Sequence, residues 1–172
     1  MKNYLIIRLS IFTAIAVLIG VFAHDLIYYL KSLVGSVMIL FGVEGLLFPI
    51  FRVKKKFLTE MQFYLGIVDL ILGVVLITSI KNFDDICIIW GTWTIVRESV
   101  DLYEIGHKVM HRFPAVLSLA LSIAEIVLSV FLIIYAEERQ AMTHIYLLVP
   151  EFVINGLSPL LFEIHKKRRK KK

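Results

Sequence analysis

The stretch MQFYLGIVDLILGVVLITSI, residues 61–80, runs for 20 residues with one charged side chain, that of Asp69. A helix of this length rises about 30 Å, which is the thickness of the hydrocarbon core of a bilayer. These residues lack the strict alternation of apolar and polar positions that a strand of a membrane barrel needs. Five other stretches share this length and apolar character: residues 4–23, 32–51, 86–105, 115–135 and 145–164. We therefore predict six transmembrane helices.

The composition of the whole chain agrees with this prediction. Of the 172 residues, 59% are apolar and 19% are charged, and the mean hydropathy is +0.82. These values exclude a water-soluble globular domain of this size. Six spans leave only short loops, so the predicted fold is an all-α integral membrane bundle. Residues 1–165 form its single transmembrane domain, and residues 166–172 form a polybasic tail.

The distribution of Lys and Arg predicts the orientation of the bundle, because basic residues near span ends are retained in the cytoplasm. The N-terminal segment holds two, the loop at 52–60 four, the loop at 106–114 two and the tail seven, whereas each remaining loop holds one. Both termini are therefore expected on the cytoplasmic side of the cell membrane. A signal peptide cleaved before His24 is an alternative for the first span. Arg8, which interrupts the apolar run, favours a retained helix.

The net charge of +5 does not indicate a nucleic-acid partner, because the basic residues gather beside the predicted spans. Clusters of this kind bind anionic lipid headgroups. The residues expected to make these contacts are Lys54, Lys55, Lys56, Lys166, Lys167, Arg168 and Arg169. The lipid bilayer is thus the expected partner. A homo-oligomer and another membrane protein both stay open as protein partners. The single Cys87 excludes an internal disulfide.

An internal repeat of about 55 residues joins the spans in pairs. Glu44, Glu98 and Asn155 recur at separations of 54 and 57 in the even spans, and Asp69 and Glu125 at a separation of 56 in the odd spans. Each unit starts and ends in the cytoplasm, which predicts three parallel helical hairpins about an axis along the membrane normal.

The repeat residues also carry a resemblance to a known family. The helix Gly66-Ile-Val-Asp-Leu-Ile-Leu-Gly, and the helix Gly42-Val-Glu-Gly-Leu-Leu-Phe-Pro before a basic loop, resemble the HdeD family of small six-span bacterial membrane proteins. The resemblance covers residues 4–165 as a pattern. It implies three tandem hairpins in the cytoplasmic membrane and, as for the founding member, a role in acid resistance. The chain departs from the family in its charged fourth span, its long basic tail and a third loop without proline.

Charged residues inside the spans are the candidate functional site, since each costs about 2.5–3.5 kcal/mol at mid-helix on the insertion scale. Arg97 lies on one helical stripe with Glu98 and Asp101, and can pair with Asp101 one turn away. Arg97, Glu44, Asp69 and Glu125 are expected at similar depth, close to the bilayer centre, and the predicted polar cluster also includes Glu98, Asp101 and Asn155. Fully ionised, the six charged groups would carry a net charge of minus 4. Some carboxyls must therefore be protonated, hydrated or bound to a cation.

Two functions are compatible with this cluster. A hydrogen-bonded network would fix helix register in an integral protein with a structural or protective role in membrane or acid stress. Alternatively, titratable groups at one depth could serve a proton- or cation-coupled permease. His107 and His111 have the spacing of metal ligands but lack a third ligand in register, so neither a metal nor a cofactor is expected. The chain lacks the signatures of nucleotide-binding, serine-hydrolase and metalloprotease sites, so we predict that it is not an enzyme.

Overall fold

The structure is a computed structural model that describes residues 2–53, 61–108 and 113–169. Helices account for almost all of these residues, and no strand occurs among them. The elements are α1 (Lys2–Leu26), the 3-10 helix η1 (Ile27–Tyr29), α2 (Leu30–Val53), α3 (Met61–Ser79), α4 (Phe83–Lys108), α5 (Phe113–Ile134) and α6 (Glu138–Arg169). The predicted all-α fold is therefore confirmed for the described residues. Each α-helix contains one predicted span, apart from a single residue at the ends of α3 and α5.

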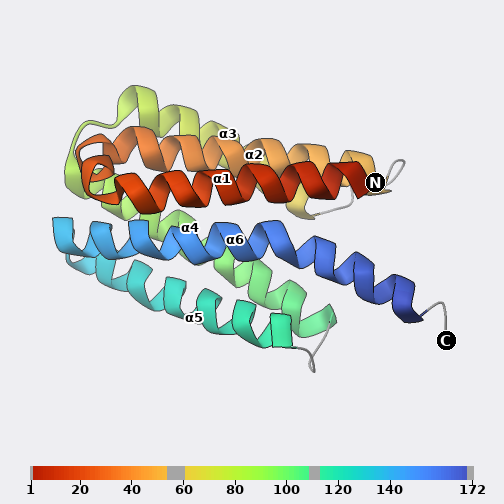
Figure 1. Ribbon diagram of the computed structural model, residues 1–172. Helices are drawn as coiled ribbons and strands as arrows, with labels where there is room; N and C mark the ends of the chain where they lie inside the picture. The colour runs from red at the N-terminus through yellow and green to blue at the C-terminus, as the bar shows by residue number, and fades with distance from the viewer. Residues whose placement is uncertain (1, 54–60, 109–112, 170–172) are drawn as a thin grey trace.

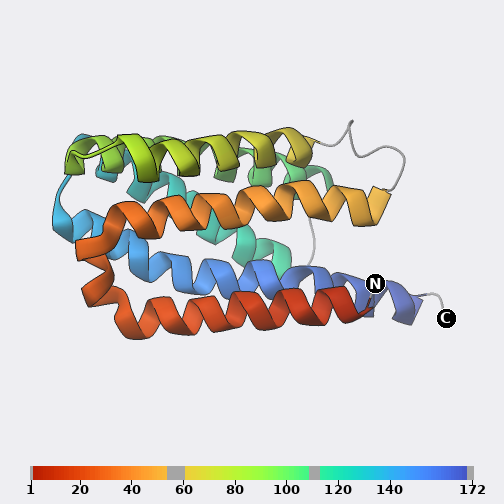
Figure 2. The same cartoon turned by 90° about the horizontal axis from the view of Figure 1, so that it is seen from above.

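The α-helices run up and down along a common direction (Figures 1 and 2). The N-terminus and the C-terminus lie at the same end of the bundle, and η1 lies at the opposite end. At that opposite end α4 begins after Asn82, whose side-chain amide donates a hydrogen bond to Asp85 at 3.0 Å. Asp84 and Asp85 occupy the first turn of α4, where the helix dipole favours negative charge.

Four helices supply most of the core. The buried apolar residues come mainly from α1, α2, α4 and α6, whereas α3 and α5 contribute few and lie against α2 and α4. Phe41 of α2 is central: its ring lies 6.0 Å from that of Trp93 in α4, 5.4 Å from Phe152 in α6 and 6.1 Å from Phe12 in α1. Contacts of this geometry between aromatic rings stabilise a core beyond the area that they bury.

Glycines allow three pairs of helices to pack closely along their lengths, and we call them the close pairs: α2 with α3, α4 with α5, and α1 with α6. A methyl group at Gly66 would lie only 2.8 Å from the carbonyl oxygen of Gly42. In the second pair, a methyl group at Gly91 would lie 2.9 Å from the carbonyl oxygen of Ser129. The glycines of α2 and α3 therefore allow the two backbones to approach closely.

The close pairs differ from the units of the sequence repeat. Each predicted hairpin consists of two helices joined at the η1 end of the bundle: α1 with α2, α3 with α4, and α5 with α6. The closest packing therefore joins neighbouring hairpins, because the glycines lie on the faces between hairpins. The backbones of the two helices within one hairpin lie in close contact over a shorter length than those of the close pairs.

Two stretches are long and apolar enough to cross a membrane by length and composition: Ile6–Leu47, which covers most of α1, η1 and α2, and Met61–Ser79, which is α3. Leu119–Ile134 of α5 is a shorter apolar helix. Large apolar side chains are exposed on every α-helix, and most of them belong to α1, α3 and α5. Buried polar and charged side chains lie inside instead, among them Asp69, Glu98 and Glu125.

Candidate functional site

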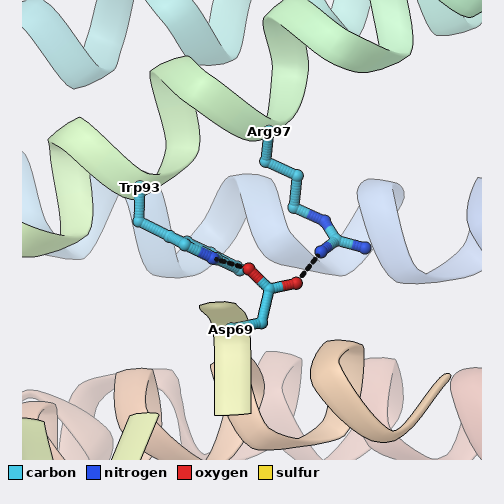
Figure 3. A network of polar contacts seen from close by, with 3 residues as sticks. All are labelled: Asp69, Trp93 and Arg97. Atoms are coloured by element: carbon cyan, nitrogen blue, oxygen red, sulfur yellow. Dashed lines mark hydrogen bonds and ion pairs between the residues drawn. The ribbon is translucent and has the colours of Figure 1, made fainter. Parts of the chain in front are cut away.

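Asp69 of α3 accepts hydrogen bonds from two side chains of α4. The indole Nε1–H of Trp93 donates to Asp69 Oδ1 at 2.7 Å, and the guanidinium Nη1 of Arg97 forms an ion pair with Asp69 Oδ2 (Figure 3). Trp93 and Arg97 are four residues apart, so one turn of α4 presents both donors to the same carboxylate. The Asp69 side chain is 3% exposed and that of Arg97 is 20% exposed. One acid of α3 is thereby satisfied by one face of α4.

The Arg97 guanidinium also contacts aromatic rings of the core. Its Cζ lies 4.0 Å from the centroid of the Phe41 ring and 5.7 Å from that of Trp93. A cation over an aromatic face is stabilised by the ring quadrupole, and more strongly where water is excluded. Arg97 therefore joins the charged pair of α3 and α4 to the aromatic centre on α2.

A second ion pair joins α1 and α2. The Arg8 guanidinium pairs with the Glu44 carboxylate, and the two side chains are 12% and 13% exposed. The Cζ atom of Arg8 lies 5.1 Å from the centroid of the Phe12 ring, one turn along the same helix. The sequence interpretation counted Arg8 as a basic residue that sets topology. In the structure its side chain reaches across to Glu44, an acid of the other helix in the same hairpin.

A third polar contact joins α5 and α6. His144 Nδ1 lies 3.2 Å from Glu125 Oε2, and His144 Nε2 lies 3.3 Å from the Ser129 hydroxyl. Exposures of 0–2% place all three side chains in the interior, and the Trp90 ring lies 5.0 Å from the imidazole. Glu125 and Ser129 are one turn apart on α5, so the imidazole fits between them.

These contacts follow the predicted hairpins. Arg8 with Glu44 bridges α1 and α2, Asp69 with Arg97 bridges α3 and α4, and Glu125 with His144 bridges α5 and α6. The close pairs are thus joined through glycine contacts and the hairpins through charged or polar side chains. The long side chains of Arg and Glu can bridge two helices whose backbones are too far apart for a glycine contact.

The remaining predicted acids lie around Arg97, together with Glu151, which the sequence analysis does not assign to the site. Glu98 of α4 accepts a hydrogen bond from Ser122 of α5 and interacts electrostatically with Arg97, Asp101 and Glu125. Glu151 of α6 interacts with the same four charged residues of α4 and α5. Glu44 interacts with Arg97 and Asp101 as well as with Arg8. The structure therefore brings the predicted acids and Arg97 into one electrostatic network.

The network contains more acids than bases. In the described middle turns of the helices, six carboxyl groups accompany two guanidinium groups and one imidazole: Glu44, Asp69, Glu98, Asp101, Glu125 and Glu151, with Arg8, Arg97 and His144. Burial of unbalanced charge is expensive, so an interior of this composition requires protons, water or a cation on some of the acids. The arrangement can hold helices in register, and it can also exchange protons.

Some predicted site residues lie where side chains are not described. Asn155 falls in α6, but its side-chain surroundings lie outside the described part, as do those of Lys166, Lys167, Arg168 and Arg169 at the end of the same helix. Lys54, Lys55 and Lys56 fall between α2 and α3, outside the described residues. His107 and His111 are likewise not described at the side-chain level. Among the side chains that are described, no group of three His, Cys, Asp or Glu could hold a metal ion.

Two partners of the site were missed by the sequence analysis. The sequence analysis does not identify Trp93. The indole N–H of a tryptophan in an apolar span nevertheless requires an acceptor, and Asp69 of the preceding helix supplies it. His144 lies one residue before the predicted sixth span and was also left out. Because α6 begins at Glu138, His144 lies within the helix, opposite Glu125. An unpaired acid in the fifth span was the signal that pointed to a base in the sixth.

No protein-family model, no curated protein and no solved structure matches this chain. The functional interpretation therefore depends on the geometry of the site.

Proposed function

We propose that the chain is a six-span protein of the cytoplasmic membrane, built from three tandem helical hairpins with both termini in the cytoplasm. The exposed surface of all six α-helices carries large apolar side chains, while charged side chains lie inside. Soluble proteins seldom expose apolar patches of this extent, whereas a lipid-facing surface requires them. The position of both chain ends at one end of the bundle agrees with an even number of crossings.

Within that arrangement the proposed role is structural or protective, in membrane or acid stress, without catalysis. The observation that carries this proposal is the set of three bridging contacts, one in each hairpin. Apolar helix faces are interchangeable in lipid, and polar contacts between helices fix which faces meet. The resemblance of residues 42–49 and 66–73 to the HdeD family adds the link to acid stress.

The proposed partners follow from the charge distribution. The basic residues between α2 and α3 and at the end of α6 would bind anionic headgroups on the cytoplasmic leaflet. The exposed apolar faces of α1, α3 and α5 would contact lipid tails, a second copy of the chain or another membrane protein.

The structural role is tested in cells that lack the gene. Expression of the wild-type chain should restore survival after an acid shock, and Arg97→Leu, which removes the bridge of the second hairpin, should restore less because the folded protein is less abundant. Survival and the amount of membrane-inserted protein are measured together. Val75→Ala, an exposed position on α3, serves as the matched control and should behave as wild type. Full survival with Arg97→Leu at reduced abundance would contradict the structural role.

A proton- or cation-coupled permease is the second candidate, and the excess of acids around Glu98, Glu125 and Glu151 favours it. In this case reconstituted vesicles should show a flux when a proton or cation gradient is imposed. Asp69→Asn or Glu125→Gln should abolish the flux, because each removes an exchangeable proton at mid-depth. The flux is followed with a pH-sensitive dye or a tracer cation. Wild-type vesicles that pass neither protons nor cations under any gradient would eliminate the permease.

A further inference from the structure

A groove of about 260 Å³ lies between α3 and α4. Its walls include Val68 and Leu72 of α3 and Val96 of α4, and its base includes Asp69, Trp93 and Arg97. Val68 and Val96 are 48% and 51% exposed, so the groove opens on the outer surface of the bundle. That surface faces lipid in the proposed function, on which the inference below depends.

The depth of the groove limits what can occupy it. Arg97 follows the first residue of α4 by 14 positions and precedes the last by 11. At 1.5 Å per residue it lies about 21 Å from one end of the helix and about 16 Å from the other, close to the bilayer centre. The headgroups of phospholipids and the carboxylates of fatty acids stay near the interfaces, so they do not reach this depth. An occupant that offers Arg97 a hydrogen-bond acceptor must therefore have a polar part that is stable at the bilayer centre.

The charge at the base of the groove limits the occupant further. Both oxygens of Asp69 already accept hydrogen bonds, and Glu44, Glu98 and Glu151 also interact electrostatically with Arg97. Among the described residues the Arg97 guanidinium donates only through Nη1, to Asp69, while 20% of its side chain is exposed. Its other N–H groups need acceptors. An anionic ligand would leave a net negative charge in hydrocarbon, so the matching acceptor is a neutral one.

We propose that this groove binds a quinone-type lipid: an uncharged ring with carbonyl oxygens, attached to an apolar tail. A carbonyl of the ring accepts a hydrogen bond from Arg97. The ring lies beside Trp93, and the tail leaves between Val68 and Val96 into the bilayer. A volume of about 260 Å³ is near the lower limit of small-molecule pockets, which suits a ring whose tail remains outside.

The experiment measures the binding of decyl-benzoquinone to the full chain in detergent micelles, through quenching of tryptophan fluorescence. Wild type should show saturable quenching, and decylbenzene, which has the same tail without carbonyls, should compete weakly. Val96→Phe, which fills the groove without touching the ion pair, should raise the dissociation constant by about tenfold or more. Val75→Phe is the matched control, because Val75 is exposed on α3 but does not line the groove, and should leave binding unchanged.

Three results would overturn the inference. Equal competition by decylbenzene would show that the groove accepts any alkyl tail, including that of a phospholipid. Unchanged binding in Val96→Phe would place the quinone elsewhere. Quenching without saturation would indicate partition into the micelle. Each variant is checked for wild-type helix content and thermal stability. A correctly folded chain that crosses the membrane six times but binds no quinone leaves the proposed function in place and removes only this site.

Discussion

The carboxylate of Asp69 receives one donor on each oxygen, and both donors come from a single turn of α4. This geometry means that the hydrogen bonds of the indole Nε1–H and of the Arg97 Nη1 donor both depend on the one carboxylate of Asp69. In a low-dielectric interior, a partly satisfied polar network is less stable than either a complete one or an apolar core. The consequence can be measured at single residues.

Arg97→Leu should lower the free energy of unfolding by about 3–5 kcal/mol, because it leaves the buried Asp69 carboxylate without its counter-ion. The double variant Asp69→Asn with Arg97→Leu should recover a large part of this loss, since no uncompensated charge remains. Thermal or denaturant unfolding in detergent gives both values. If the double variant is as unstable as Arg97→Leu alone, the loss arises from packing around the Arg97 side chain and the interpretation as an ion pair is wrong.

Sequence reasoning identified the acids of this network but not all of their partners. A charged residue within an apolar run is visible in one segment, whereas its partner depends on which helix faces which. Arg8 and His144 lie near the ends of their apolar runs, where a basic residue is equally well explained by the membrane interface. Their roles became visible only when the hairpins placed them opposite Glu44 and Glu125.

The helices of the close pairs differ in how tightly their glycines pack against the neighbouring helix. In the close pair α2–α3 the helix backbones touch through Gly42, Gly45 and Gly66. Any side chain at these positions would force the helices apart. Gly20 of α1 is different, because a methyl group there would meet only Val149 at an ordinary distance of 3.7 Å. Gly66 and Gly20 therefore form a matched pair, because both lie in apolar helices but only Gly66 touches the backbone of another helix.

Gly66→Ala should destabilise the protein by about 1–3 kcal/mol, since the added methyl group clashes with the backbone of α2. Gly20→Ala should be neutral or stabilising by up to about 1 kcal/mol, because alanine restricts the unfolded chain more than glycine does. Unfolding of the two variants in the same detergent compares them directly. Equal effects at both positions would argue against the close approach of α2 and α3.

The extent of the elements was predictable and their pairing was not. Length and apolarity located each helix, because each one coincides with a long apolar stretch of the sequence. The repeat predicts which helices form a hairpin but not which helices pack most closely. The closest contacts lie between hairpins, since Gly66 and Gly73 face glycines of the helix before them in the chain. A glycine pattern predicts close contact but does not name the partner helix.

On the scale of the whole molecule, the two ends of the bundle differ in composition. The end that contains both termini receives most of the basic residues of the sequence, whereas Asp25, Asp84, Asp85, Glu137 and Glu138 belong to the η1 end. This difference predicts the orientation of the protein in the membrane. Both termini lie at one end of the bundle and η1 lies at the other. We propose that the end with the termini faces the cytoplasm, and labelling tests this orientation.

Cysteine labelling of intact cells determines this orientation. In a Cys87→Ser background, Asn82→Cys and Glu137→Cys at the η1 end should react with a membrane-impermeant thiol reagent. Lys172→Cys should react only after the cells are permeabilised. Labelling of Lys172→Cys in intact cells, with protection of Asn82→Cys, would reverse the orientation. Labelling of all three in intact cells would contradict the odd number of crossings predicted between Lys172 and each of the other two positions.

The ion pair between α3 and α4 has a consequence for biogenesis. In the proposed membrane topology, Arg97, Glu98 and Asp101 in its middle would make α4 a poor substrate for insertion by the translocon on its own, whereas α3 would enter readily. Asp69 leaves the ribosome before Arg97 and can neutralise it as the second helix arrives. The two helices are therefore expected to enter lipid as one unit, so that α3 acts as an internal chaperone for α4 during synthesis.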